Sequence, residues 1–262
     1  MHIETLPRFP LAQLPTPIER LERLSRELGG PELLIKRDDQ TGLALGGNKT
    51  RKLEFLVGQA LEQGADTLVT AGAAQSNHCR QTAAAVVKAG LKCELILNGK
   101  KPELPNGNLL LDELLGAKCH WIERSQFPVK LSELPEQLRA QGRKPYVIGI
   151  GGSNGVGATG YVLAMMELTE QLRATEHRVD HIVFASSSGG TQAGMVPALE
   201  SRGSEADCME CPSTKTIWSV RPTKKKWRRL PMSVRNTSAR TCDWPGNTSR
   251  LFTAIRAKVT AS

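Results

Sequence analysis

A lysine at the start of a predicted helix is the first group in this sequence that could do chemistry. It ends the run Gly46-Gly47-Asn48-Lys49, directly before an amphipathic stretch. The positive end of the helix dipole disfavours the ammonium form of a lysine at this position. Such a lysine can supply the neutral amine that Schiff-base chemistry needs. Taken alone, the run is also typical of a surface lysine after a glycine turn.

A second run, Gln75-Ser76-Asn77-His78, follows an apolar strand-like segment and opens another predicted helix. Backbone N–H groups at a helix N-terminus, together with Ser and Asn side chains, can bind a carboxylate. Ser and Asn are also the residues preferred at an ordinary N-cap. The run therefore indicates either an anion site or a simple cap.

A third run, Ser188-Gly189-Gly190-Thr191, also lies between a predicted strand and a predicted helix. Small residues let the backbone surround an anion, and the helix N-terminus then faces it. The run lacks the lysine of a Walker motif, so a cofactor phosphate fits it better than ATP does. A further glycine-rich turn at 149–155 has the same position between strand and helix.

Hydrophobic periodicity predicts alternating strands and helices along the chain, and these runs lie between them. Strands are predicted at 67–71, 93–97, 118–122, 146–150 and 181–185, and helices at 50–63, 76–89, 108–115, 131–140 and 156–174. This alternation indicates an α/β fold with parallel strands joined by right-handed crossovers. Ligands bind at the carboxyl ends of such strands, so we expect the runs to meet Lys49 in one crevice.

The order and spacing of the motifs resemble the family of D-cysteine desulfhydrases, cysteate sulfo-lyases and 1-aminocyclopropane-1-carboxylate deaminases. The resemblance covers residues 8–196 only, and the segments that carry it are RFPLAQLPTPIERLERL, IKRDDQTGLALGGNKTRKLEFL, AGAAQSNHCRQTAA, NGNLLLDELLGA, GRKPYVIGIGGSNGVGATGY and SSSGGTQAGM. It implies the fold-type II architecture of tryptophan-synthase-β-like enzymes, pyridoxal 5′-phosphate as cofactor, a small amino-acid substrate and a homodimer in the intact family.

The resemblance also implies roles for individual residues. Lys49 would hold the cofactor and move the substrate α-proton, with Ser76 as a second catalytic residue. Asn77 would hydrogen-bond the ring oxygen, and the phosphate would be bound by Ser188, Gly189, Gly190 and Thr191. The pocket for the substrate carboxylate would be lined by Gln75, Ser76, Asn77 and His78. Lys52 matches no role in the family.

Within the family, the QSNH and GGSN runs resemble the desulfhydrase and cysteate-lyase branch. The deaminase branch more often has QSNQ and GCSD. The resemblance therefore implies a lyase most like D-cysteine desulfhydrase, which converts D-cysteine to pyruvate, sulfide and ammonia. Ring opening of 1-aminocyclopropane-1-carboxylate is the alternative.

Family architecture predicts a two-domain chain with parallel sheets and an incomplete large domain. Residues 1–48 would begin the large domain, 49–160 form the small α/β domain, and 161–196 return to the large domain with the phosphate run. Residues 197–262 form a basic tail without family resemblance, which we expect to be poorly ordered. Its abrupt start inside a predicted helix is typical of a frame shift or truncation, with a genuine extension as the alternative. We therefore expect little turnover by this chain.

Charge is distributed unevenly along the chain. The formal net charge is +9, and residues 197–262 contain 13 basic and 5 acidic residues, so the remainder is nearly neutral. The run at 224–229 interleaves lysine and arginine with tryptophan, so an inactive fragment with a nucleic-acid-binding tail is a further alternative. A solvated basic run is the simpler interpretation, and nucleic acid is not an expected partner.

Cysteines and the N-terminus argue against other classes of protein. The six cysteines are scattered and do not form a disulfide framework. Cys208 and Cys211, with Cys242 further on, have partial zinc spacing but no fourth ligand, so we predict no metal. The first residues contain several prolines and no apolar run, which predicts neither a signal peptide nor a membrane anchor. A cytoplasmic protein is expected.

Overall fold

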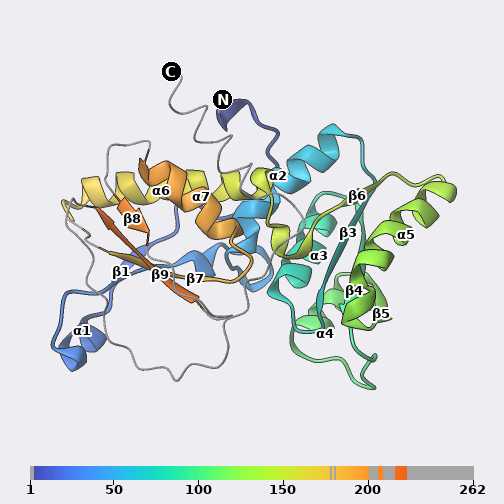
Figure 1. The fold of residues 1–262 in the computed structure, drawn as a ribbon, viewed down its shortest axis with the longest axis horizontal. Coiled ribbons are helices and arrows are strands. Elements are labelled where there is room, and N and C mark those ends of the chain that lie inside the picture. The colour runs from blue at the N-terminus through green and yellow to red at the C-terminus, as the bar shows by residue number, and fades with distance from the viewer. Residues whose placement is uncertain (1–2, 178, 180, 201–205, 209–215, 223–262) are drawn as a thin grey trace.

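The computed structural model describes residues 3–177, 179, 181–200, 206–208 and 216–222 (Figure 1). Helix α2 (Lys49–Glu62) lies between two groups of elements. Strands β3 to β6 with helices α3 to α5 form one group. Strand β7 with helices α6 and α7 forms the other. The helix that begins with Lys49 thus contacts both halves of the fold.

A parallel four-stranded sheet forms the first group. Its strand order is β5-β4-β3-β6, and the strands are β3 (Thr67–Ala73), β4 (Lys92–Asn98), β5 (Lys118–Ile122) and β6 (Pro145–Val147). The connecting helices are α3 (Asn77–Lys88), α4 (Gly107–Leu114) and α5 (Phe127–Ala140). Every pair of neighbours is parallel, which confirms the predicted α/β fold.

Helices cover both faces of this sheet, as the continuous apolar strands require. Leu68 and Leu95 pack with residues of α2 and α3 in the larger core cluster. Val69 and Ile96, one position further along each strand, face the opposite way and pack against α5. All four side chains are fully buried, which contributes about 1.5–3 kcal/mol each. The sheet therefore fixes the positions at which the loops after β3 and β6 leave it.

The second group is built on close contacts between helices. Helices α6 (Gly155–Ala174) and α7 (Gly190–Glu200) pack with β7 (Ile182–Ser186) around Tyr161, Met165 and Met195. A Cβ on Gly160 of α6 would lie 2.2 Å from the carbonyl oxygen of Arg51 in α2. A Cβ on Gly194 of α7 would lie 2.1 Å from the carbonyl oxygen of Ala158. Only glycine permits these two approaches.

The N-terminal region forms a small hairpin. Strands β1 (Ile18–Arg20) and β2 (Leu34–Lys36) pair antiparallel, and the short helix α1 (Glu22–Leu28) connects them. Five 3-10 turns complete the main fold, at Ile3–Thr5, Asp38–Gln40, Leu43–Leu45, Arg124–Gln126 and Ile150–Gly152.

Two short pieces of the predicted basic tail form strands. Strand β9 (Thr216–Pro222) pairs antiparallel with β7 and with β8 (Ala206–Cys208). The basic run at 224–229, Cys211 and Cys242 lie outside the described residues. Helix α6 is continuous through residue 160, so the domain boundary predicted there falls inside a helix.

Two element boundaries differ from the sequence prediction by three residues or more. Helix α5 begins at Phe127 rather than at 131, because Pro128 occupies its first turn and a capping box between Glu123 and Gln126 precedes it. Strand β6 ends at Val147 rather than at 150. The chain turns out of the sheet there through Gly151, which has a φ of 72°.

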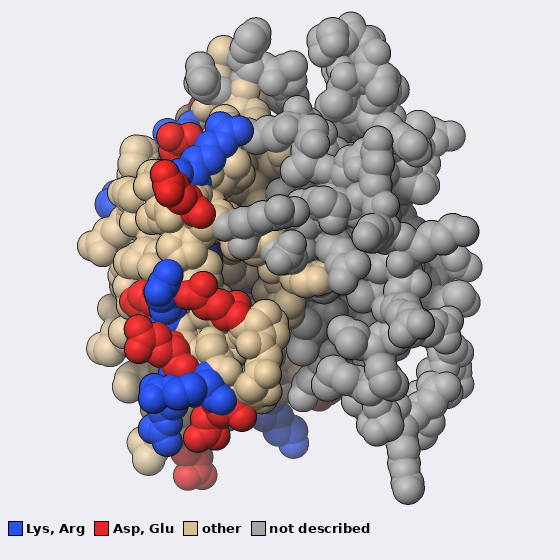
Figure 2. All heavy atoms as spheres, turned by 90° about the vertical axis from the view of Figure 1, so that its left-hand side faces the viewer, with Lys and Arg blue, Asp and Glu red and all other residues tan. Residues whose placement is uncertain are grey.

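The surface charges, the helices and the possible metal ligands of the described residues bear on binding to nucleic acid, membranes and metals. On the face shown in Figure 2, acidic and basic side chains of the described residues are interspersed rather than gathered by sign. Within the described ranges, no helix is long and apolar enough to cross a membrane. The same ranges contain no group of three His, Cys, Asp or Glu residues that could hold a metal ion.

Candidate active site

Lys49 is the first residue of α2 and follows a tight glycine turn. Gly46 and Gly47 have φ values of +66° and +126°, and a Cβ on Gly46 would lie 2.0 Å from the carbonyl oxygen of Asp39. Glycine is therefore required at this turn. Lys49 is half-buried, and this burial lowers the pKa of its amine. The neutral amine that the sequence predicts is favoured by desolvation.

Lys52 lies three residues further along α2, almost completely buried at 1% exposure. Burial, and then the nearby charge of Lys49, lower the pKa of Lys52 to about 7. A Cβ on Gly190 would lie 2.7 Å from its Nζ atom, so the ammonium reaches the first residue of α7. Lys52 makes no hydrogen bond or ion pair with any residue that the structure describes. The motifs in the sequence imply no role for Lys52, although its spacing from Lys49 places both on one face of a helix.

Three of the predicted runs lie close together beside Lys52: the Lys49 run, the 188–191 run and the glycine-rich turn at 149–155. The Nδ2 atom of Asn48 donates to Oγ1 of Thr191 at 3.3 Å, which joins the Lys49 turn to the start of α7. The hydroxyl oxygens of Ser153 and Ser188 are 2.6 Å apart. A Cβ on Gly190 would lie 2.6 Å from the Ser153 hydroxyl. The structure therefore brings together the glycine-rich turn, the third run and both lysines.

The QSNH run lies beside the same turn. Ser76 caps α3, accepting from the backbone N–H of Cys79 at 3.3 Å. The backbone N–H of Thr50 donates to Oε1 of Gln81 at 2.8 Å, which ties the first turn of α2 to α3. Ser76 and Asn77 are at least partly exposed, so both are accessible to solvent. The capping role and an anion-binding role are both compatible with this position.

Gln75 and His78 are placed differently from their neighbours. Both ends of the Gln75 amide are occupied: Nε2 donates to Oδ1 of Asn106 at 2.9 Å, and Oε1 accepts from the Asn108 N–H at 2.9 Å. The His78 side chain is 4% exposed. Direct contact of either side chain with a substrate carboxylate stays a prediction, and for Gln75 it requires these bonds to open.

The imidazole of His78 has a defined protonation state. Burial, and then the charges of Lys49 and Lys52, lower its pKa to about 3. Its Nε2 atom is 2.9 Å from Oγ1 of Thr70, and that hydroxyl donates to the carbonyl oxygen of Ile148 at 2.8 Å. Because the hydroxyl has one proton, His78 must donate through Nε2. Nδ1 is then an acceptor, and it has no hydrogen-bond partner among the described residues.

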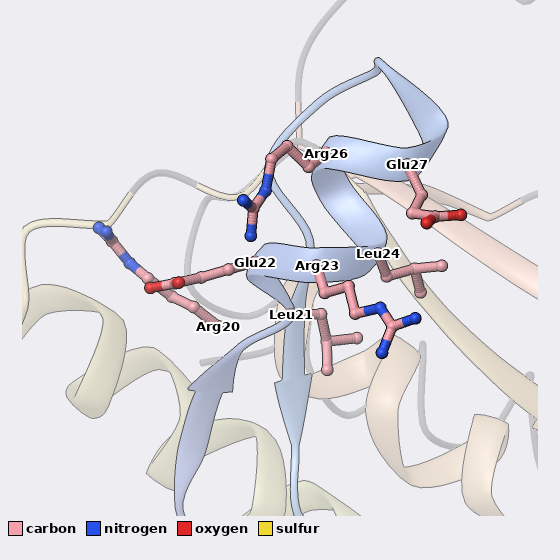
Figure 3. Close-up of a pocket in the computed structure, with 7 residues that line it drawn as sticks. All are labelled: Arg20, Leu21, Glu22, Arg23, Leu24, Arg26 and Glu27. Atoms are coloured by element: carbon pink, nitrogen blue, oxygen red, sulfur yellow. The ribbon is translucent and has the colours of Figure 1, made fainter.

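A separate hollow lies beside α1 (Figure 3). Its lining comes from residues 20–24, 26 and 27, and it contains none of the residues singled out in the sequence. Charged side chains of both signs project around it. The hollow therefore takes no part in the candidate site.

Comparison with known proteins agrees with this arrangement. The family described as "Pyridoxal-phosphate dependent enzyme" matches residues 10–252. The chain belongs to the pyridoxal-phosphate dependent enzymes. The match extends past residue 196, where the motifs in the sequence end.

Individual members of the family are also similar to this chain. It is 48% identical over 209 residues to the D-cysteine desulfhydrase of Klebsiella pneumoniae (strain 342), and 48% identical over 200 residues to that of Serratia proteamaculans (strain 568). These matches cover 76% and 74% of this chain. The chain spans 63% and 60% of the length of the two relatives.

Two solved structures have a similar fold. A structure described as the ACC deaminase homologue matches with a TM-score of 0.67 and 44% identity, covering 75% of this chain and 60% of that one. Apo diaminopropionate ammonia lyase from Escherichia coli matches with a TM-score of 0.56 and 19% identity, covering 70% of this chain and 54% of that one. The second likeness supports the fold alone.

The residues at the meeting point fit the phosphate of the family's cofactor. Only glycine at position 190 leaves room for the Ser153 hydroxyl and the Lys52 ammonium, which lie close to its backbone. Gly190 is also the first residue of α7, and the first N–H groups of a helix have no partner within the helix. A buried cation without an anionic partner beside such donors is the environment in which an anion is stabilised.

Proposed function

We propose that this chain carries the cofactor-binding half of a pyridoxal-phosphate-dependent lyase that acts on small amino acids, most like D-cysteine desulfhydrase. The observation that carries the proposal is the pair of lysines on α2, with Lys49 half-buried and Lys52 buried against Gly190 of the 188–191 loop. The identity to relatives named D-cysteine desulfhydrase supports the substrate class. Because the chain spans under two thirds of those relatives, turnover is proposed for the whole protein.

Phosphate binding is proposed for the loop and the buried lysine together. Lys52 would supply the positive charge, and the binding groups of the loop would be Ser188, Gly189, Gly190 and Thr191. A phosphate dianion beside Lys52 would restore the charged form of its amine, since an opposite charge raises the pKa of a lysine. Burying Lys52 without an anionic partner thus costs electrostatic free energy in the free protein, and a bound phosphate would remove this cost.

Lys49 would hold the cofactor and carry the α-proton of the substrate. When bound, pyridoxal phosphate supplies an aldehyde for a lysine amine and a ring that withdraws electrons. Burial lowers the pKa of Lys49, which favours the neutral amine that can accept a proton. Asn77 would hydrogen-bond the ring oxygen, with Ser76 as the second catalytic residue. The proposed carboxylate pocket consists of Gln75, Ser76, Asn77 and His78, with the buried His78 imidazole forming its rear wall.

A second candidate substrate is 1-aminocyclopropane-1-carboxylate, favoured by the likeness to the ACC deaminase homologue. His78 in the QSNH run favours the desulfhydrase over the deaminase. Ammonia release by a full-length relative with the same runs should be faster from D-cysteine than from 1-aminocyclopropane-1-carboxylate. The reverse order would favour the deaminase. A homodimer, a cytoplasmic location and domain boundaries at 49 and 160 remain part of the proposal.

Covalent mapping tests the role of Lys49. The full chain would be mixed with pyridoxal phosphate, reduced with borohydride and digested, and the labelled peptide sequenced. We expect the label on Lys49, with complete loss in Lys49→Ala. Lys52→Gln serves as the matched control, because it should weaken phosphate binding but leave the labelled position unchanged. A label on Lys36 or Lys52 in the unsubstituted chain would contradict the proposal.

A further inference from the structure

Arg80 joins the two loops that carry the candidate catalytic residues. It lies in the first half of α3 and is 7% exposed. Its Nη2 atom donates to the carbonyl oxygen of Gly46 at 2.8 Å, three residues before Lys49. Its Nη1 atom donates to Oδ1 of Asn108 at 3.2 Å. One buried guanidinium therefore contacts both the Lys49 turn and the start of α4.

Asn108 in turn contacts the QSNH run. Its Nδ2 atom donates to Oδ1 of Asn77 at 2.9 Å and to the carbonyl oxygen of Gln75 at 2.8 Å. The chain of contacts thus runs from Arg80 through Asn108 to Asn77. Each link joins a donor to an acceptor.

This chain of contacts has only one consistent orientation. An arginine can only donate, so the Asn108 atom that faces Arg80 must be its oxygen. The amide nitrogen of Asn108 then faces Asn77 and must donate, which requires the oxygen of Asn77 to accept. The NH2 group of Asn77 is left pointing away, and it donates to no residue within the described part of the chain. Asn77 itself is exposed to solvent.

We propose that Arg80 and Asn108 are positioning residues that turn the NH2 group of Asn77 toward the ring oxygen of the cofactor. The proposal rests on the proposed function, because it takes the ligand of Asn77 to be pyridoxal phosphate. Neither positioning residue touches the ligand. Arg80 also fixes the Gly46 carbonyl, so the same contact sets the distance between Asn77 and the Lys49 turn.

Asn108→Asp is the variant that reverses the orientation without changing size. One carboxylate oxygen can still accept from Arg80, but the other now faces Asn77 and can only accept. Asn77 must then turn its NH2 group to Asp and present its own oxygen to the crevice. Asn106→Asp is the matched control. It adds the same charge two residues away, and Asn106 already acts as an acceptor, from Nε2 of Gln75.

Two ligands that cannot react with Lys49 provide the measurement. Pyridoxine 5′-phosphate retains the ring oxygen, and its 3-deoxy analogue lacks it. Binding of each to the full chain would be measured by calorimetry. We expect the unsubstituted chain and Asn106→Asp to prefer pyridoxine 5′-phosphate by about tenfold, the value of one hydrogen bond to a charged group. Asn108→Asp should lose this preference while still binding the 3-deoxy analogue.

The possible outcomes separate this inference from the proposed function. Equal weakening of both ligands in Asn108→Asp, or loss of both, would overturn the positioning role, because general damage does not distinguish the ring oxygen. Asn108→Ser, which leaves the Asn77 amide unfixed, should lower the preference by a smaller factor, and an unchanged preference would also overturn the role. Failure of the unsubstituted chain to bind pyridoxine 5′-phosphate would instead overturn the proposed function.

Discussion

Two neighbouring cationic residues of α2 are buried to the same extent, but only one of them has anionic partners among the described residues. Arg51 and Lys52 are each 1% exposed. Arg51 donates to Asp38 at 2.8 and 2.9 Å and to Glu167 at 2.9 and 3.0 Å. Lys52 has no anionic partner among the described residues. A buried cation that is fully paired serves the fold, whereas one without a partner indicates a place for an anionic ligand.

The pKa shifts of the two side chains have opposite directions. Burial alone lowers the pKa of Arg51, but its hydrogen bonds with Glu167 and Asp38 outweigh burial and raise it. No hydrogen bond or anionic partner among the described residues offsets the burial of Lys52, and its pKa falls to about 7. The network around Arg51 also includes Lys36, which contacts Glu167 at 2.5 Å, and Tyr161, which donates to Asp38 at 3.0 Å.

Removing the paired cation should have the largest effect on stability. In Arg51→Met, Asp38 and Glu167 lose their main partner at a partly buried site, and we expect the free energy of unfolding to fall by about 3 kcal/mol. Urea unfolding of the full chain measures this. Arg37→Met is the control, since Arg37 pairs with Glu19 and Asp39 at the surface and should change the free energy of unfolding far less. Equal effects would show that burial does not distinguish the two arginines.

The neutral imidazole of His78, whose pKa is lowered by Lys49 and Lys52, provides a second test of how buried polar groups are stabilised. In Thr70→Val, the Nε2–H of His78 and the carbonyl oxygen of Ile148 lose their hydroxyl partner. We expect unfolding to become easier by about 1–3 kcal/mol, the cost of leaving buried polar groups unsatisfied. Thr82→Val removes a hydroxyl that only bonds back to the His78 carbonyl within α3, and it should cost less than about 1 kcal/mol. A larger effect at Thr82, measured by the same urea titration, would contradict this account.

Removing the unpaired cation should change stability with the opposite sign. The folded pKa of Lys52 is about 7 and the unfolded value is 10.5, so the unfolded chain binds more protons between these pH values. The cost of burying Lys52 is therefore greatest at pH 7 and below, and it disappears as the pH rises to 10.5. Lys52→Met should raise the unfolding temperature at pH 7, with little change near pH 10.5.

Phosphate provides the second half of this test. Added inorganic phosphate should raise the unfolding temperature of the unsubstituted chain but not that of Lys52→Met. The control is Lys88→Met, at an exposed lysine near the end of α3, which should change neither quantity. A drop in stability at pH 7 in Lys52→Met would show that the lysine is paired after all.

Local patterns were sufficient to predict most of the fold. Strand β5 has the predicted bounds, and α2, α3 and α6 begin within one residue of the prediction, because their apolar periodicity is regular. The start of α5 was missed because its first turn contains Phe127 and Pro128, before the regular periodicity begins. Its signal was present in the Glu123 and Gln126 pair that precedes the helix.

The site could be predicted only where its residues form contiguous runs. Lys49 and the 188–191 loop were identified from glycine-rich turns, and the structure brings them together. Lys52 was passed over because nothing in its local sequence distinguishes it from a surface lysine of α2. The partners of Arg51 lie 13 and 116 residues away, and Arg80 acts through Asn108, so these contacts depend on tertiary packing that no local pattern encodes.

The glycines at the helix crossings limit how this scaffold can diversify. Gly160 brings α6 onto the backbone of α2, and Gly194 brings α7 onto the backbone of α6, with no side chain between them. The separation of the Lys49 helix from the 188–191 loop is therefore set by main chain against main chain. Exchange of side chains cannot adjust it gradually. New substrate preferences within such a scaffold are expected to arise from loop residues such as 75–78, while the three helices stay unchanged as an inherited frame.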